Sequence, residues 1–405
     1  MNGHTIHIVF SGGGTGGHLF PGLAVAEQLA AMIPLVRITF CGGGKPFERQ
    51  CVSRAGFDYF ALPARPLPHG AREAVSFVVE NLAGYLAAGR FLREEEVAAV
   101  VGLGGYASVP MAHAAARRRV PLVLLEQNTV PGKATRWLAR RASLICTTFK
   151  ETQPRLSCRC PVRVTGNPVR AGFVQGRRAE GGGRKNDLIR DPKSEIQETH
   201  DCLCSPPSAL RLPPSQLLVL GGSGGARALN ESVPRAIYKI RHLLQGWRIM
   251  HQSGQAGLEA TQTLYGKLDL AATVVPFLSD VPAALHATDL AVCRAGGTTL
   301  AELAAAGVPA VLAPYPHATD DHQAANARLF SAGGGCITID QREVAGSLDD
   351  QLAEMLCFLL ANDGLRRQMS AAMREMARPH AAEDVAELIW SIVSSRAIRA
   401  ELAAA

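Results

Sequence analysis

The amino-acid sequence predicts an α/β protein of two doubly wound domains, each with a parallel sheet covered by helices. Short apolar runs alternate with helical patterns, which is the rhythm of βαβ units. This alternation occurs twice, on either side of a stretch rich in charge, glycine and proline. The length of 405 residues, 47% of them hydrophobic, suits two domains of about 100 to 200 residues each.

The elements of the first half follow one another in βαβ order. Strands are expected at residues 5–10, 36–41, 97–103 and 120–125, with a helix at 21–32. In the second half, Ala- and Leu-rich helical stretches separate five expected strands, at residues 216–220, 248–251, 273–275, 290–293 and 310–313. The final stretch, 382–402, reads as a helix with apolar side chains such as Trp390, so it must pack against another part of the protein.

The predicted domain boundaries lie where these patterns change. We expect a first domain at residues 1–171, a second at 215–380, and a C-terminal helix at 381–405 that packs back on the first domain. Residues 172–214 have the composition of a linker or surface insertion that is disordered in part.

Composition and charge exclude several classes of protein. Lys and Arg total 42 against 35 Asp and Glu, and this net charge of +7 suits an anionic substrate or membrane surface but is too dilute for nucleic acid. The N-terminus does not read as a signal peptide, and glycines and a proline break the uncharged stretch 97–116, so no transmembrane helix is expected.

The ten cysteines are scattered along the chain and read as reduced thiols. Two close pairs, Cys158/Cys160 and Cys202/Cys204, have C-x-C spacing instead of the C-x-x-C of zinc sites. We therefore expect no metal site.

Three glycine-rich loops each follow an expected strand. They are SGGGTGGH at 11–18, GLGGYAS at 102–108 and LGGSGGAR at 220–227. Backbone N–H groups at a helix N-terminus form an anion site when no side chain covers them. No acidic residue ends the strand that follows the first or the last of these loops, as a dinucleotide ribose would require, so a cleft between two nucleotide-binding domains is favoured over NAD chemistry. The structural alternative is that the glycines only make tight turns.

Polar residues follow other strands at the edge where ligands bind in open α/β sheets. They are Glu126, Gln127 and Asn128, the GNPVR segment that ends in Arg170, and Arg294. The GGTTLAEL segment then places Thr299 and Glu302 on one face of a helix. This pair is read either as a capping box with Thr299 as N-cap or as a group that hydrogen-bonds a nucleotide ribose.

Seven motifs together resemble one known family. They are GGGTGGHLFPGLAVAEQL, GLGGYASVP, EQN, GNPVR, GGSGGARALN, HQSG and CRAGGTTLAELAAAGVPAVLAPYPHATDDHQAANA. In this order they resemble the bacterial MurG-type glycosyltransferases over about residues 5–380, apart from the insertion. The resemblance implies a GT-B fold, in which two Rossmann-like domains face each other across a cleft. It also implies transfer of GlcNAc from UDP-GlcNAc to the C4 hydroxyl of the MurNAc in undecaprenyl-diphospho-MurNAc-pentapeptide, with inversion.

The resemblance also assigns the donor site. UDP-GlcNAc is a substrate, and no further cofactor or metal is implied. Glu302 with Thr299 would hold the ribose, Arg294 and the backbone of Phe277 and Leu278 would frame the uracil, and Ser223 would receive the diphosphate. His322 and Gln323 would contact the donor sugar, with Asn128 across the cleft. Arg170 would offset phosphate charge as UDP leaves, and its structural alternative is a salt bridge at the domain linker.

The acceptor site is assigned to the first domain. Thr15, Gly16 and Gly17 of the first loop, with the GLGGYAS loop at 102–108, would hold the acceptor diphosphate. His18 is the leading candidate for the base that takes the proton of the C4 hydroxyl, and Glu126 is its rival or partner. The family usually has a histidine immediately before this glutamate, and here the residue is Leu125.

A lipid-linked acceptor implies that the first domain docks on the cytoplasmic face of the membrane as a peripheral protein. An apolar set with neighbouring arginines suits an anionic surface. The set is Phe77, Val78, Leu82, Tyr85, Leu86, Phe91 and Leu92 with Arg90 and Arg93, followed by Arg136, Trp137, Arg140 and Arg141. The alternative is that most of these apolar residues are ordinary core.

Two other functions stay open at this level. One is a GT-B sugar-nucleotide epimerase, or a transferase with another acceptor. The other is a non-catalytic scaffold that binds a nucleotide and recruits cell-wall synthesis proteins.

Overall fold

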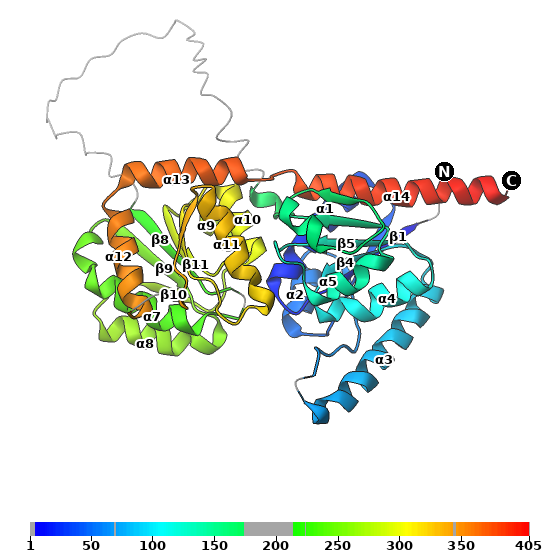
Figure 1. The fold of residues 1–405 in the computed structure, drawn as a ribbon, viewed down its shortest axis with the longest axis horizontal. Helices are drawn as coiled ribbons and strands as arrows, with labels where there is room; N and C mark the ends of the chain where they lie inside the picture. The colour runs from blue at the N-terminus through cyan, green and yellow to red at the C-terminus, as the bar shows by residue number, and fades with distance from the viewer. Residues whose placement is uncertain (1–4, 69, 174–213, 223, 343–345, 405) are drawn as a thin grey trace, which may run out of the picture.

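The computed structural model describes residues 5–68, 70–173, 214–222, 224–342 and 346–404. The chain forms two α/β units that lie side by side (Figure 1). Of the expected linker at 172–214, residues 174–213 lie outside the described residues.

The first unit has a seven-stranded sheet in the order β3-β2-β1-β4-β5-β6-β7, with every neighbouring pair parallel. Its strands are β1 (Ile6–Gly12), β2 (Val36–Gly42), β3 (Asp58–Ala61), β4 (Val97–Gly104), β5 (Leu122–Glu126), β6 (Leu144–Thr147) and β7 (Val162–Val164). Its helices are α1 (Gly16–Met32), α2 (Pro46–Arg54), α3 (Ala71–Glu94), α4 (Val109–Arg117) and α5 (Lys133–Leu138), with short 3-10 turns η1 (Tyr106–Ser108), η2 (Ala139–Arg141) and η3 (Lys150–Arg155).

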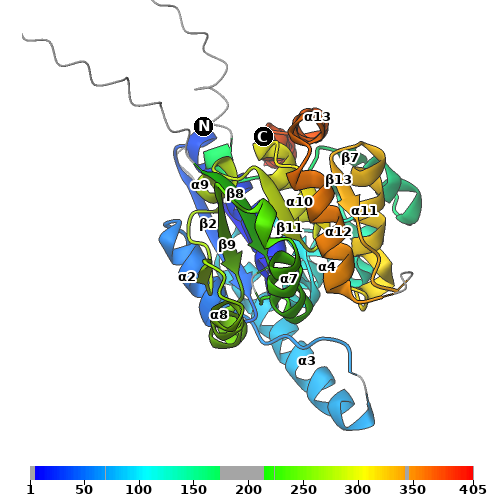
Figure 2. The ribbon, with the colours of Figure 1, turned by 90° about the vertical axis from the view of Figure 1, so that its left-hand side faces the viewer.

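The second unit has a six-stranded parallel sheet in the order β10-β9-β8-β11-β12-β13. Its strands are β8 (Ser215–Leu220), β9 (Trp247–Gln252), β10 (Thr273–Val275), β11 (Leu290–Cys293), β12 (Ala310–Leu312) and β13 (Cys336–Thr338). Its helices are α7 (Arg227–Lys239), α8 (Leu258–Lys267), α9 (Val281–His286), α10 (Gly297–Ala306), α11 (His322–Ala332), α12 (Leu348–Leu360) and α13 (Asp363–Met376), with 3-10 turns η4 (Arg241–Leu243), η5 (Gln255–Gly257) and η6 (Thr319–Asp321). Figure 2 views this unit with α7 and α12 toward the reader.

The sequence predicts the inner strands of both sheets correctly and misses β3, β6, β7 and β13. These four strands have only three or four residues each, too few for a hydrophobic period to stand out. The expected helix at 21–32 is wrong at its start, because α1 already begins at Gly16.

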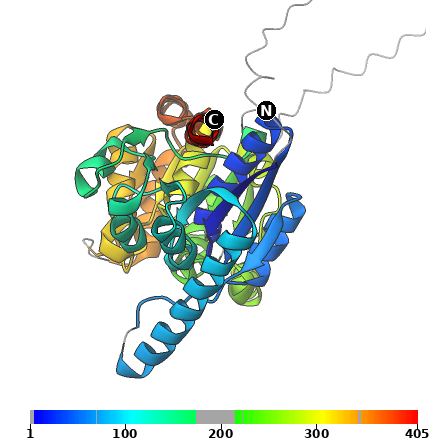
Figure 3. The ribbon, with the colours of Figure 1, turned by 90° about the vertical axis from the view of Figure 1, so that its right-hand side faces the viewer.

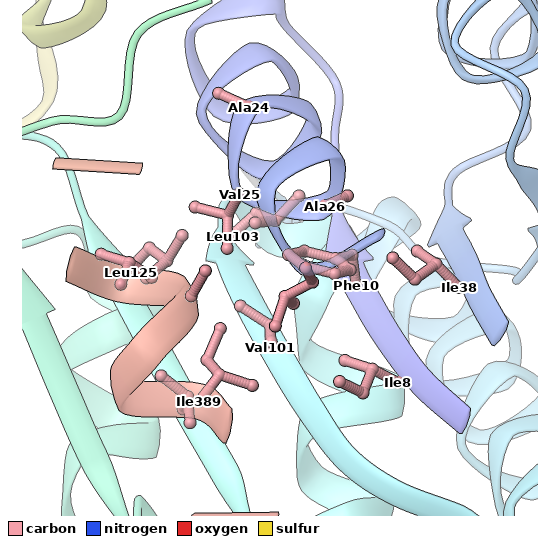
Figure 4. Packing of buried hydrophobic residues seen from close by; sticks show 14 of the residues in the cluster. Ile8, Phe10, Ala24, Val25, Ala26, Ile38, Val101, Leu103, Leu125 and Ile389 are labelled. Carbon is pink, nitrogen blue, oxygen red and sulfur yellow. The ribbon is translucent and has the colours of Figure 1, made fainter. Parts of the chain in front are cut away.

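The first sheet buries both faces through the alternation of its strands. Ile8 and Phe10 of β1 point toward α1 and the C-terminal helix, whereas Val9 packs on the opposite face with Ala88 of α3 and Met111 of α4. Figure 4 shows Val101 of the sheet next to Ile389, and Phe10 below Ala26 of α1. This double coverage leaves the carboxyl ends of the strands as the open edge.

The last helix, α14 (Ala381–Ala404), crosses from the second unit to the first. In Figure 1 it continues from α13, which covers the second unit, and runs along the first unit beside α1. Val385, Ala386 and Ile389 of α14 are fully buried in the core that contains Ile8 and Val101. The two units are therefore joined by a packed helix as well as by the segment after β7.

Candidate active site

The carboxyl edges of the two sheets face each other across a cavity of about 930 Å³. A smaller cavity of about 120 Å³ shares part of its wall. The large cavity is lined from the first unit by Thr15, Gly17, His18, Gln127 and Asn128, and from the second mainly by Gly221, Gly222, Gly225, Arg294, Thr299, Tyr315, His322 and Gln323. The small cavity is lined by Gly16, Phe20, Arg170, Gln252, Phe277, Leu278, Thr299 and Glu302, among others.

A proline in α1 creates one of the contacts that hold the units together. Pro21 lies inside the helix and has no N–H to donate to the carbonyl of Gly17, four residues earlier. The side chain of Thr298, at the start of α10, donates to that carbonyl instead, at 2.7 Å. Asn167 donates to the same Thr298 hydroxyl at 3.1 Å, so α1, α10 and the GNPVR segment meet at one point.

His18 lies in the first turn of α1 and lines the cavity. Its Nδ1 lies 3.2 Å from the hydroxyl of Thr15. Burial, with a smaller contribution from the facing His322, lowers the pKa of His18 to about 4. The imidazole is therefore neutral at pH 7, which is the form that a general base requires.

Glu126 does not fit the role of base that the sequence suggested. It is 4% exposed at the end of β5, and it does not line the large cavity. One carboxylate oxygen accepts from the backbone N–H of Asn128 at 3.1 Å and the other from the N–H of Gly132 at 3.0 Å. Burial raises its pKa. The carboxylate thus shapes its own loop, and we assign it to positioning instead of proton transfer.

The loop after β5, whose N–H groups donate to Glu126, also hydrogen-bonds to the second unit. Its partner there is a residue that was not predicted from the sequence. Asn326 of α11 is fully buried, and its Oδ1 accepts from both the backbone N–H and the hydroxyl of Thr129 at 2.9 Å. Its Nδ2 donates to Asn128 Oδ1 at 3.0 Å and to the Ala295 carbonyl at 3.1 Å. The only signal for Asn326 in the sequence was its place inside the DDHQAANA motif.

The same two segments approach so closely that α10 must begin with glycine. A Cβ on Gly297 would lie 2.1 Å from the carbonyl oxygen of Gln127, a distance that no side chain tolerates. The Gln127–Asn128 segment therefore packs directly on the N-terminus of α10. Asn128 thereby reaches the wall of the cavity opposite His322 and Gln323.

The glycine loop at 220–227 leads from β8 into α7 and lines the large cavity. Because the loop at 11–18 is its counterpart in the first unit, these two are called the first and the second glycine loop below. The N-cap residue of α7 is Ala226, and within the described residues no side chain caps this helix. Its first backbone N–H groups thus have no partner within the helix and remain available to an anion. Ser223, expected to receive the diphosphate, lies outside the described residues.

Gln252, at the end of β9, joins this loop to the loop that carries Phe277. Its Nε2 donates to the carbonyl of Gly222 at 2.8 Å and to the carbonyl of Pro276 at 3.2 Å. Because both partners are carbonyl oxygens, the orientation of the amide is unambiguous. In the sequence, Gln252 stands inside the HQSG motif, and nothing there indicated its role.

The capping-box interpretation of Thr299 and Glu302 is wrong. The N-cap of α10 is Gly296, and Thr299 is already the third residue of the helix. Glu302 instead accepts from Arg170 twice on Oε1, from Nη2 at 2.5 Å and from Nε at 3.1 Å. Burial raises the pKa of Glu302, and the Arg170 guanidinium opposes that rise. Arg170 also stacks on the ring of Phe20, at 4.3 Å from its centroid.

The structure shows one of the two expectations for Arg170. Arg170 forms the interdomain salt bridge that was the structural alternative, and it lines the small cavity; its expected action on the phosphate charge of UDP stays a prediction. Oε2 of Glu302 receives no hydrogen bond from the described residues and remains an acceptor for a ligand hydroxyl.

The structure does not bring Arg294 together with Phe277 and Leu278. The two apolar residues line the small cavity with Glu302, whereas Arg294 lines the large one. Arg294 Nη1 donates to the carbonyls of Ala313 and Pro314, at 2.8 and 3.1 Å. Burial lowers its pKa. Arg294 therefore hydrogen-bonds the segment that follows β12 and is not among the residues that line the cavity of Phe277.

His322 and Gln323 form the far wall of the large cavity, at the start of α11. His322 Nδ1 lies 2.7 Å from the Thr319 carbonyl, and Gln323 Oε1 accepts from the backbone N–H of Tyr315 at 2.9 Å. The amide nitrogen of Gln323 and Nε2 of His322 are thus the groups left for a ligand.

No group of three or more His, Cys, Asp or Glu side chains with metal-binding geometry occurs in the part of the chain that the structure describes. Cys158 and Cys160 are free thiols there, and Cys202 and Cys204 lie outside it.

Two Rossmann-like units, a ligand-sized cleft at their facing edges and an uncapped helix N-terminus in its wall define a GT-B protein of the kind that binds sugar nucleotides. Residues 8–147 match the N-terminal domain of glycosyltransferase family 28, and residues 216–385 match its C-terminal domain. The chain belongs to this family.

Individual relatives agree over nearly the whole chain. The UDP-N-acetylglucosamine–N-acetylmuramyl-(pentapeptide) pyrophosphoryl-undecaprenol N-acetylglucosamine transferase of Methylococcus capsulatus is 37% identical over 385 residues, covering 94% of this chain and 97% of that protein. The crystal structure of Acinetobacter baumannii MurG is 29% identical with a TM-score of 0.66, covering 95% of this chain and 99% of that one. A UDP-GlcNAc 2-epimerase from Neisseria meningitidis, 11% identical with a TM-score of 0.63 over 95% and 99% of the two chains, shares the fold alone.

Proposed function

We propose that the protein transfers GlcNAc from UDP-GlcNAc to the C4 hydroxyl of the MurNAc in undecaprenyl-diphospho-MurNAc-pentapeptide. The observation that carries the proposal is the cavity, which sets a neutral histidine of the first unit opposite the second glycine loop and an uncapped helix N-terminus. Relatives of at least 30% identity over nearly the full chain bear the name of this activity, which supports the same substrates.

The donor occupies the second unit in this proposal. The uridine enters the small cavity, where Phe277 and Leu278 form an apolar wall and Oε2 of Glu302 accepts from the ribose. The diphosphate lies at the second glycine loop and the N-terminus of α7, whose free N–H groups favour negative charge. The sugar then extends into the large cavity toward His322, Gln323 and Asn128.

His18 acts as the base in the transfer. In the tautomer that carries its proton on Nδ1, which lies 3.2 Å from the Thr15 hydroxyl, Nε2 is the nitrogen that accepts the proton of the acceptor hydroxyl. As that proton leaves, the hydroxyl oxygen bonds to C1 of GlcNAc on the face opposite the leaving group, and the bond from C1 to the phosphate oxygen breaks. The configuration at C1 is inverted, and Arg170 and the helix N-terminus balance the charge on the departing UDP. No metal enters this scheme.

The first unit meets the membrane through α3 in this proposal, on the cytoplasmic face. None of the helices in the described ranges is long and apolar enough to cross a bilayer. Figure 3 shows α3 projecting away from the rest of the unit. Its exposed apolar side chains form one stripe at helical spacing. They are Val75, Val78, Val79, Leu82 and Leu86, each more than half exposed.

The apolar set expected from the sequence divides into two groups. Leu92 is 7% exposed and Phe91 packs against Phe60, so both belong to the core, while Val78, Leu82 and Leu86 face outward. A ring contact series from Tyr85 through His113 to Trp137 joins α3 to the basic residues of α5 and η2. These contacts support a surface that combines the stripe with the arginines and suits anionic lipid.

Vesicle binding tests this surface. The pair of substitutions Leu82→Asp and Leu86→Asp is expected to abolish sedimentation with phosphatidylglycerol vesicles. The control Leu35→Asp changes a residue that is 62% exposed on the same unit but outside α3, and it is expected to sediment like the wild type. Equal loss in both variants would contradict the assignment.

UDP release by the purified protein tests the reaction itself. With UDP-GlcNAc, a short-chain lipid-linked MurNAc-pentapeptide and EDTA, we expect release that depends on the acceptor. Release without the acceptor would indicate hydrolysis or epimerase chemistry. UDP-GlcNAc binding without release would indicate a scaffold.

A further inference from the structure

Glu48 is a buried carboxylate that none of the assigned roles uses. It is the third residue of α2 and only 1% exposed. Its Oε1 accepts from the backbone N–H of Gly14 in the first glycine loop at 2.5 Å, and its Oε2 accepts from the hydroxyl of Tyr59 at 2.6 Å. The carboxylate therefore connects α2 and β3 to the loop that precedes α1.

The charge of Glu48 is balanced by dipoles. Its Oε2 accepts from the backbone N–H of Lys45 at 3.4 Å, whereas the Lys45 ammonium donates to the carbonyl of Gly14 at 3.1 Å. No ion pair to Glu48 occurs among the described residues. Glu48 also stabilises the start of α2 in a capping box with Lys45, but that role does not require the bond that its Oε1 accepts from Gly14.

The first glycine loop is shaped around this carboxylate. Gly13 has φ +155°, and a Cβ there would lie 2.6 Å from Oε1 of Glu48. The amide of Gly14 is consequently already bonded on the side away from the cavity. An acceptor diphosphate in the cleft meets the first amides of α1, at Gly16 and Gly17, instead of the inner amides of the loop.

The neighbouring residue of α2 contacts the donor side. The ring of Phe47 lies 5.7 Å from that of Phe277 in the wall of the small cavity, at 75°, and 6.1 Å from that of Phe20. Phe20 in turn lies beneath Arg170. In Figure 1, α2 is on the side of the first unit that faces the second.

We propose that Glu48 is a positioning residue for the transfer reaction, and that α2 connects the two substrate sites. Glu48 fixes Gly14 and so sets the turn that carries Thr15 and His18 on the acceptor side. Phe47 supports Phe277 on the donor side. This inference rests on the proposed function, because it assigns the two contacts to the two substrates of that reaction.

The test is a pair of steady-state KM values for each variant, measured with UDP-GlcNAc and with the lipid-linked acceptor. Glu48→Gln keeps an oxygen for Gly14 but places an amide against the donors of Lys45 and Tyr59. We expect it to raise the acceptor KM about tenfold and to leave the UDP-GlcNAc KM within about twofold. Phe47→Leu should show the reverse preference. Gln50→Ala, an exposed change on the same helix, should alter neither value.

Several outcomes would overturn the inference. An active wild type with unaltered KM values in Glu48→Gln, or with both KM values raised equally, would leave Glu48 a structural residue only. If Glu48→Gln fails to fold, Tyr59→Phe, which removes one donor to the carboxylate, must raise the acceptor KM selectively. A wild type without acceptor-dependent UDP release would overturn the proposed function and this inference with it.

Discussion

The two glycine loops of the cleft have similar sequences but differ in what surrounds them. In the first, a buried carboxylate already holds the amide of Gly14, and the carbonyl of Gly17 accepts a hydrogen bond from the other unit. In the second, the described residues place no carboxylate on the loop, and Gln252 binds the carbonyl of Gly222. The amides of Gly221 and Gly225 donate to Gln252 and Gly222, so the groups available to an anion are the first amides of α7.

The difference teaches that a glycine-rich turn predicts a backbone shape and leaves its use open. The second loop suits a diphosphate because its neighbours take its carbonyl oxygens. The first loop suits the placement of a side chain, because Glu48 immobilises it just before His18. We infer that the first loop positions the base and the second receives the leaving group.

The largest expected effect is on kcat and comes from removing the base that the first loop positions. His18→Ala should lower kcat by about 10² to 10⁴, the usual contribution of a general base, because no other neutral imidazole of the described cavity belongs to the acceptor side. UDP-GlcNAc affinity, measured by calorimetry, should stay within about threefold. Thr15→Ala, which removes only the partner of Nδ1, serves as the milder comparison. A kcat near that of the wild type in His18→Ala would refute the assignment.

The next effect concerns the ion pair between Arg170 and Glu302, which joins the two units. Arg170→Met leaves Glu302 buried without its cation and should lower the free energy of unfolding by about 2 to 4 kcal/mol, measured by urea denaturation. The double variant Arg170→Met/Glu302→Gln should recover most of this loss, since no unpaired charge remains. A double variant as unstable as the single one would show that packing on Phe20, and not charge, explains the effect.

A smaller effect sharpens the role of the second loop. Gln252→Ala frees both Gly222 and Pro276, and we expect it to raise the KM for UDP-GlcNAc about tenfold while the acceptor KM stays nearly constant. Gln255→Ala, an exposed change just beyond the same strand, is the control. Equal effects of the two substitutions would remove Gln252 from the donor site.

The smallest effect is a dependence of stability on pH, to which one histidine near each loop contributes. Burial lowers the pKa of both His18 and His251 to about 4. The unfolded chain takes up protons near pH 6.5 while the folded chain resists them, so stability is complete above pH 6.5 and falls as the pH drops toward 4. At pH 5.5 each histidine should cost about 1 kcal/mol in urea denaturation.

Activity separates the two histidines. His251 is fully buried between Asn230 and Tyr265, away from the cavity, so only His18 should affect the acid limb of kcat/KM, which we expect well below pH 6.5. An acid limb at pH 6.5 or above would contradict a neutral His18 whose pKa is lowered.

The sequence predicted the two α/β units and their inner strands better than the side-chain contacts within and between them. The inner strands, both units and the cavity residues His322, Gln323 and Asn128 follow from local patterns and ordered motifs, and the structure brings these residues together. The backbone partners of Glu126 and Arg294 were not predicted, because no local pattern reports which partner a buried polar group finds.

Other residues were missed for the same reason. Asn326, Gln252 and Glu48 each have at least one partner 24 or more positions away in the chain, and such pairing depends on the folded backbone. The Leu125 that replaces the family's histidine is 2% exposed in the core, so it presents no group to the cleft.

The division of labour between the loops is tested most directly by measuring both KM values in Glu48→Gln and Gln252→Ala, in the same UDP-release assay. We predict that Glu48→Gln raises only the acceptor KM and that Gln252→Ala raises only the UDP-GlcNAc KM. Parallel changes in both KM values for both variants would contradict this prediction.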